Sequence, residues 1–180
     1  MVTEAVRIAT LKGYDVLDTG AEPAFDDLAR RIATTFAVRS AIVSFIDEER
    51  QWYKARYGVE RNAVQRAQSF CTHILDSDDV TVVPDARLHP LFRTNPHVLT
   101  DGGVRFYAAA PIKALNRARL GTVCIFDPTP RADGLSERDK RQLSSFAAQV
   151  VELLEGRRNA SRARDRAAGV PMRPTMPNAG

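Results

Sequence analysis

Apolar residues recur with a helical spacing near both ends of the chain. Between residues 22 and 36 they fall at positions that share one face of a helix. A partial stripe that includes Ile8 and Leu11 predicts a shorter helix over about residues 4–16. A capping box at Ser136 predicts the start of a last helix. The apolar face of that helix consists of Leu143, Phe146, Ala147, Val150, Leu153 and Leu154.

The middle of the chain has short runs of β-branched and aromatic residues, a pattern typical of strands. The first two runs, 40–47 and 51–57, flank a short polar turn and predict an antiparallel hairpin. In the second run we expect Trp52 to pack against a helix and Lys54 to face solvent. Further strands are expected at residues 80–83, 105–112 and 120–126. Helices at both ends with antiparallel strands between them predict an α+β fold.

The composition is that of a globular domain, with 44% apolar and 27% charged residues. No apolar run is long enough to cross a bilayer, and the first residues lack the apolar core of a secretory signal, so we expect no membrane association. Two cysteines cannot form a disulfide framework. This predicts a reducing, cytoplasmic location.

The net charge of +4 is concentrated at the end of the chain. Residues 156–180 contain six arginines and one aspartate, which leaves residues 1–155 at −1. A near-neutral body argues against nucleic-acid binding. Apolar periodicity also stops near residue 155. We therefore expect one domain over residues 1–155 and a basic, Pro/Arg-rich, disordered tail over residues 156–180.

Short motifs along the chain occur in an order that resembles the GAF domain family of bacterial signalling proteins, over about residues 4–155. They are YDVLDT at 14–19, PAFDDLA at 23–29, SFID at 44–47, RQWYKA at 50–55, SFCTH at 69–73, VPDA at 83–86, HPLF at 89–92, RFYAAAP at 105–111 and LGTVC at 120–124. Each motif is weak alone, and their order carries the resemblance.

The resemblance implies a GAF/PAS-like fold with a central antiparallel sheet of five to six strands. Terminal helices would cover one face, and pocket-forming loops and short helices the other. It further implies a sensory or regulatory module that binds a small molecule, still unidentified, and signals through a partner protein or a dimer rearrangement. We expect a homodimer that buries surplus apolar surface at Ile8, Leu11 and Val151.

Cys71 is the candidate for thiol chemistry. It lies in a short predicted helix that starts at Ser69, whose N-terminus would lower the pKa of the thiol. The alternative is a buried cysteine that acts as a small apolar residue. The resemblance also makes Cys71 the catalytic residue of an alternative function, free methionine-(R)-sulfoxide reduction. That reaction needs a resolving cysteine, and we expect Cys124 in the core, so we favour a module without enzymatic activity.

Other cofactor chemistries have weaker support. His73, His89 and His97 could join Cys71 as metal ligands, but their spacing matches no known site, and we predict no metal. The Asp-Ile-Pro motif of bilin-binding relatives, the NKFDE set of cyclic-nucleotide-binding relatives and a phosphate-binding loop are all missing. A dimerisation domain without a ligand is the remaining alternative.

The long irregular segment 84–103 and the strand after it supply the pocket candidates, because aromatic walls with a few polar groups are typical of small-molecule sites. Arg105 would alternatively form an ion pair with Asp85 or Asp101. The predicted ligand-binding residues are Phe106, Tyr107, Phe92, Cys71, Asp85 and Arg105.

Overall fold

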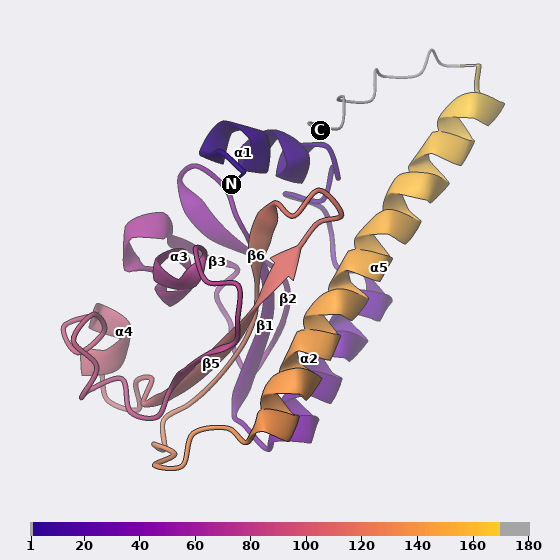
Figure 1. Cartoon of the computed structure of the whole chain (residues 1–180). Helices are drawn as coiled ribbons and strands as arrows, with labels where there is room; N and C mark the ends of the chain where they lie inside the picture. The colour runs from indigo at the N-terminus through magenta and orange to yellow at the C-terminus, as the bar shows by residue number, and fades with distance from the viewer. Residues whose placement is uncertain (1, 170–180) are drawn as a thin grey trace.

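A six-stranded antiparallel sheet, in the order β3-β2-β1-β6-β5-β4, runs through the centre of the protein (Figure 1). The computed structural model describes residues 2–169. The strands are β1 (Ser40–Ile46), β2 (Arg50–Tyr57), β3 (Ala63–Gln65), β4 (Thr81–Val83), β5 (Phe106–Lys113) and β6 (Arg119–Asp127). The predicted antiparallel sheet and the α+β class are confirmed.

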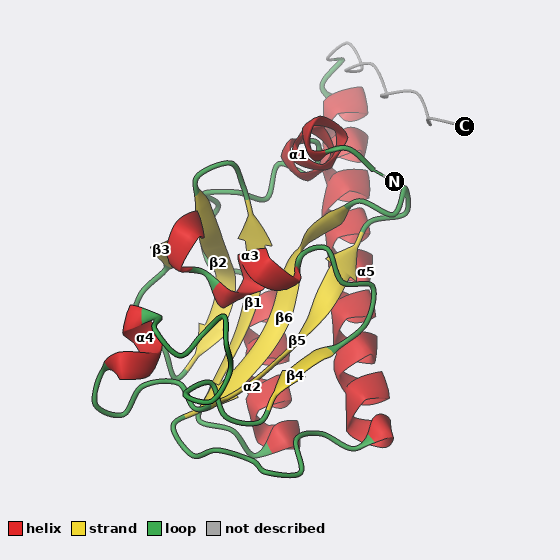
Figure 2. Ribbon diagram, turned by 60° about the vertical axis from the view of Figure 1, so that its left-hand side comes forward, coloured by secondary structure: helices red, strands yellow, loops and turns green. Residues whose placement is uncertain are grey.

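Helices cover both faces and one end of this sheet (Figures 1 and 2). The helices are α1 (Glu4–Lys12), α2 (Pro23–Phe36), the 3-10 turn η1 (Arg66–Gln68), α3 (Phe70–Ile74), α4 (Pro96–Leu99) and α5 (Glu137–Ala167). The long helices α2 and α5 pack side by side on one face, while α3 and α4 lie over the other. None of the described helices is long and apolar enough to cross a bilayer.

The sheet separates two apolar clusters. The larger cluster lies between the sheet and α2 and α5, and it includes Trp52, as the sequence predicted. The smaller cluster lies on the opposite face, between the sheet and α3. Gly121 lets β6 approach β1 at the centre, because a Cβ there would lie 2.0 Å from the Ser44 carbonyl oxygen.

Lys54 is the extra residue of a β-bulge in β2. Val43 of β1 pairs with Ala55, whereas the next residue, Ser44, pairs with Tyr53. Lys54 therefore has no pairing partner on β1, and the alternation of side chains between the two faces of the sheet is interrupted at this point. A simple two-residue period does not describe β2.

The Lys54 side chain is fully buried. Its Nζ donates hydrogen bonds to Thr19 Oγ1, the Gly20 carbonyl and Glu22 Oε1 at 2.8, 2.8 and 2.6 Å. It also lies 5.2 Å from the centroid of the Phe25 ring. The expectation that Lys54 faces solvent was wrong, because three acceptors from the segment before α2 compensate the burial of its charge.

The α1 helix closes one end of the sheet. Arg7 Nη1 donates to the carbonyls of Ile46 and Arg119 at 2.7 and 3.3 Å, which ties α1 to the ends of β1 and β6. Ile8 and Leu11 are 7% and 0% exposed. The expectation that these two side chains are surplus surface for a dimer was wrong, because they pack beneath α1.

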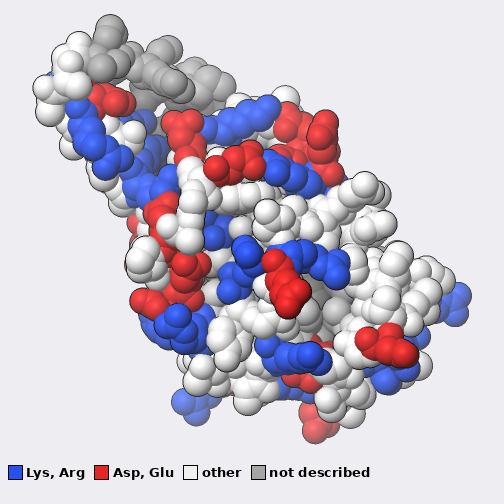
Figure 3. All heavy atoms as spheres, turned by 180° about the vertical axis from the view of Figure 1, so that it is seen from behind, with Lys and Arg blue, Asp and Glu red and all other residues white. Residues whose placement is uncertain are grey.

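The α5 helix continues to Ala167, twelve residues past the expected domain boundary at residue 155. Its last turns extend beyond the sheet (Figure 1) and are mostly exposed. Basic side chains gather on this projecting end (Figure 3), and they include Arg157, Arg158, Arg162 and Arg164. The segment 156–167 is thus helical, while residues 170–180 of the predicted disordered tail lie outside the described residues.

Because the ammonium group of Lys54 is buried and that of Lys12 is exposed, we expect substitution of these two lysines to lower the free energy of unfolding by different amounts. Lys54→Ala should lower the free energy of unfolding by about 2–4 kcal/mol, because its acceptors lose a buried donor. Arg157 also contacts Glu22, which limits the loss. Lys12 pairs with Glu48, and both side chains are more than half exposed, so Lys12→Ala should cost less than about 1 kcal/mol. Urea unfolding of both variants measures the difference, and equal losses would contradict this role of Lys54.

Candidate functional site

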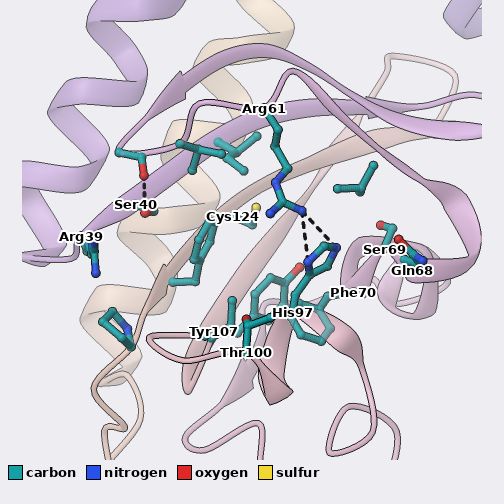
Figure 4. A pocket seen from close by; sticks show the side chains of 18 of the residues that line it. Arg39, Ser40, Arg61, Gln68, Ser69, Phe70, His97, Thr100, Tyr107 and Cys124 are labelled. Atoms are coloured by element: carbon teal, nitrogen blue, oxygen red, sulfur yellow. Dashed lines mark hydrogen bonds between the residues drawn. The ribbon is translucent and has the colours of Figure 1, made fainter.

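A cavity of about 580 Å³ lies on the face of the sheet opposite α2 and α5. Its floor is formed by β1, β2, β5 and β6, and its sides by α3 and by the loop after α4 (Figure 4). Aromatic and polar residues both contribute to the walls. The aromatic lining residues are Tyr53, Phe70, Tyr107 and Phe126. A cavity of this size is typical of small-molecule sites.

The mouth of the cavity carries charged side chains. Arg61 Nη1 lies 3.1 Å from His97 Nδ1, and Figure 4 shows the two side chains meeting above Tyr107. Burial lowers the pKa of His97, and the Arg61 charge lowers it further, so His97 is a neutral acceptor at pH 7. Arg39 and Asp101 also lie at the lining.

Buried polar groups form a connected network at the floor. Ser69 Oγ donates to Gln51 Oε1 at 2.7 Å, and Gln51 Nε2 donates to Ser44 Oγ at 2.8 Å. Ser69 also accepts from the Thr72 backbone N–H and so caps α3. The network therefore fixes α3 over β1 and β2.

Cys71 lies at the centre of this network and is 1% exposed. Gln51 Nε2 and Thr122 Oγ1 each donate to Cys71 Sγ at 3.0 Å, and the Tyr107 hydroxyl lies at the same distance. Cys71 therefore lines the cavity, and it has polar partners rather than purely apolar ones.

Cys124 lies beside Cys71 at the same floor. It is buried, as expected for a mid-strand residue, but it lines the same cavity. The argument that Cys71 lacks a second cysteine nearby was wrong, because the sheet register points Cys124 toward α3.

Burial opposes ionisation of the Cys71 thiol, but hydrogen bonds with Cys124, Thr122, Tyr107 and Gln51 outweigh it and lower its pKa to about 7. The hydrogen bond with Cys71, together with burial, raises the pKa of Cys124 well above its usual range. The two thiols are coupled, and the hydrogen bonds to Cys71 make it the sulfur of the pair that ionises more readily.

The three predicted aromatic residues separate into three positions. Tyr107 lines the cavity. Phe106, the preceding residue on β5, points to the opposite face and belongs to the cluster under α2 and α5, so its predicted place in the lining was wrong. Phe92 is buried behind the wall, with its ring centroid 4.5 Å from that of Phe70, and it supports the cavity without lining it.

Asp85 and Arg105 form an ion pair away from the cavity. Arg105 Nε donates to Asp85 Oδ1 at 2.7 Å, and Arg105 Nη2 donates to Asp85 Oδ2 at 2.5 Å. The hydrogen bond from Arg105 lowers the pKa of Asp85. This bidentate pair joins the loop after β4 to the start of β5, and neither residue lines the cavity.

The three histidines have separate surroundings. His97 contacts Arg61, His89 stacks on Phe92 at 4.6 Å, and His73 meets another edge of that ring at 5.8 Å. Within residues 2–169, no three His, Cys, Asp or Glu side chains gather as a metal site.

Gln51, Thr122 and the Arg61–His97 contact also belong to the site, and none of them was predicted from the sequence. Thr122 is two residues from Cys124, and Gln51 is two residues from Tyr53, so strand alternation could have assigned both to the cavity face. No pattern in the sequence indicates that Arg61 and His97 meet, because Arg61 lies in the loop before β3 and His97 in the distant helix α4.

The GAF domain model matches residues 20–154. A curated relative, cyclic di-GMP phosphodiesterase PA2567 of Pseudomonas aeruginosa, is 34% identical over 148 residues. The match covers 82% of this chain but only 25% of the relative, so the chain spans about a quarter of that protein's length.

Two solved structures share the fold at low sequence identity. The GAF domain of an Acinetobacter phosphoenolpyruvate-protein phosphotransferase is 15% identical with a TM-score of 0.61, over 89% of this chain and 95% of that one. A free methionine-R-sulfoxide reductase from Neisseria meningitidis, solved with its substrate, is 16% identical with a TM-score of 0.58, over 89% and 93%. With the family model matching most of the described residues, the chain belongs to the GAF domain family.

Proposed function

We propose that this protein is a cytoplasmic sensory or regulatory module that binds a small organic molecule between the sheet and α3. The observation that carries the proposal is the cavity of about 580 Å³, which combines aromatic walls with a buried polar floor. The regulatory role agrees with the relative from Pseudomonas, in which the matched region makes up only a quarter of a larger phosphodiesterase.

The lining favours a planar ligand that carries an anionic group. Tyr53 and Phe126 contribute aromatic rings to the lining, whereas Arg61 lies at the mouth. Within the described residues, Arg61 contacts neutral His97 and has no carboxylate partner. A ligand carboxylate or phosphate at the mouth would supply that partner, and its ring would lie against the aromatic wall.

A homodimer remains part of the proposal, with a surface different from the one first expected. Ile8 and Leu11 are buried, but Val6 on α1 is 42% exposed and the last turns of α5 project from the body. The projecting turns of α5 are mostly exposed in a single copy. A second copy along the projecting part of α5 would stabilise it.

Light scattering tests this assembly. We expect a dimer for the full chain and a monomer for a chain that ends at Glu155, because the projecting turns would be removed. A monomeric full chain at micromolar concentration would contradict the homodimer. It would leave the end of α5 to a different partner protein.

Native mass spectrometry of protein purified from its own host tests ligand binding. We expect a non-covalent bound mass on the wild type and on Leu88→Trp, since Leu88 is 80% exposed and does not line the cavity. Val64→Trp should abolish that mass, because Val64 lines the cavity and the indole would fill it. A wild type without bound mass, or a Val64→Trp variant that keeps it, would contradict the proposal.

Free methionine-(R)-sulfoxide reduction is a second candidate, favoured by Cys124 beside Cys71. The pair supplies a low-pKa sulfur and a neighbouring thiol within one cavity. In this alternative Cys71 would attack the sulfoxide and Cys124 would resolve the product to a disulfide.

Turnover of free methionine-(R)-sulfoxide, coupled to thioredoxin and NADPH, decides between the candidates. The sensory proposal predicts no turnover above background for wild type or for Cys71→Ser. The reductase alternative predicts turnover that Cys71→Ser abolishes. Circular dichroism serves as the control, because the Ser hydroxyl can accept the same hydrogen bonds and the variant should stay folded.

A further inference from the structure

The two cysteines of the chain come from distant parts of the sequence and meet at the floor of the cavity. Cys71 is in α3 and Cys124 is in β6, and their exposures are 1% and 2%. Both residues line the cavity, and each has little exposed surface. Neither sensory binding nor the sheet's packing requires this juxtaposition.

The surroundings of Cys71 suit a thiolate better than a thiol. Three groups capable of donating, Gln51 Nε2, Thr122 Oγ1 and the Tyr107 hydroxyl, lie 3.0 Å from its sulfur. A thiol has one proton and a weakly accepting sulfur, whereas a thiolate accepts several hydrogen bonds. The arrangement resembles an oxyanion hole, with sulfur in place of oxygen.

Cys124 has the complementary role. Its pKa is raised by the hydrogen bond with Cys71 and by burial, so it keeps its proton when Cys71 loses one. Resolution of a sulfenic acid to a disulfide needs a second sulfur nearby, and Cys124 must give up its proton as it attacks.

We propose that Cys71 and Cys124 form a peroxide-reactive dithiol at the floor of the cavity, with Cys71 as the nucleophile and Cys124 as the resolving thiol. The substrate class is a small hydroperoxide. This redox site is separate from the proposed ligand binding, although both use the same cavity.

The reaction balances in two steps. The Cys71 thiolate attacks the outer oxygen of the hydroperoxide, so that an S–O bond forms, the O–O bond breaks, and the leaving alkoxide or hydroxide takes a proton from solvent. The protonated product on Cys71 is a sulfenic acid.

In the second step the Cys124 sulfur attacks the Cys71 sulfur. An S–S bond forms, and the S–O bond breaks. Hydroxide leaves and combines with the Cys124 proton as water. Two electrons pass from the thiol pair to the peroxide.

Disulfide formation would also change the site around it. A disulfide sulfur is a poorer acceptor than a thiolate, so Gln51, Thr122 and Tyr107 would lose their shared partner. Because Gln51 also receives the hydrogen bond from Ser69 that fixes α3, oxidation would shift α3 at the side of the cavity. Peroxide chemistry would thereby alter ligand binding.

Hydrogen peroxide is the probe, and intact mass, thiol alkylation after unfolding and dimedone labelling are the readouts. After peroxide treatment, reduced wild type should lose the mass of two hydrogen atoms, and neither of its thiols should react with the alkylating reagent. In denaturant the polypeptide should remain a single chain, because the disulfide forms within it. Cys124→Ser should accumulate a sulfenic acid that dimedone labels. Cys71→Ser should show neither change at the same peroxide concentration.

Tyr107→Phe tests the donor arrangement without removing a sulfur. Loss of one donor should raise the pKa of Cys71 by about one unit and slow oxidation at pH 7 about five-fold. Tyr57→Phe is the matched control, because Tyr57 is 44% exposed and does not contact Cys71, and its rate should equal that of wild type. The thiolate absorbance should show a pKa of Cys71 below that of an ordinary thiol in wild type and in this control.

Three results would each overturn the proposal. They are retention of both thiols in peroxide-treated wild type, equal sulfenic acid labelling in the two serine variants, and a disulfide that links two chains. If a serine variant does not fold, peptide mapping of partly oxidised wild type still decides, because the sulfenic acid should form on Cys71 and not on Cys124.

Discussion

The polar network beneath α3 is the constraint on which the site depends. Buried polar groups are costly unless each finds a hydrogen-bond partner, and on this face of the sheet they find one another. Gln51 joins Ser44 on β1 to Ser69 and Cys71 at the start of α3. A five-residue helix has little stability of its own, so its position follows from this network and from the packing of Phe70 against Tyr107.

The two faces of the sheet consequently differ in what they do. The face under α2 and α5 is filled by apolar side chains and holds the domain together. The opposite face leaves a cavity, because its centre carries polar side chains that are covered by the short helices α3 and α4 and by irregular loops. The bulge at Lys54 belongs to the first face, where a buried cation fixes the segment before α2.

The proposed ligand binding and the proposed thiol chemistry take place in the same cavity. Arg61 and His97 at the mouth offer a positive charge next to a neutral ring, while the floor holds Cys71 among its donors. A change at the floor acts on α3 through Gln51, and α3 forms one side of the cavity. Ligand binding in the cavity and oxidation of Cys71 would therefore influence each other through the position of α3.

The sequence by itself determined most of the helices and strands and the family, because helical and strand periods and local caps depend on near neighbours. The apolar stripe of α2 and the cap at Ser136 predicted helices that the structure contains. Tyr107 and Cys71 were also found from their motifs. Only the tertiary structure decided that Lys54 and Ile8 are buried, that Phe106 leaves the cavity, and that Cys124 lies beside Cys71. These outcomes depend on a bulge, on strand register and on contacts between distant segments, which local patterns do not encode.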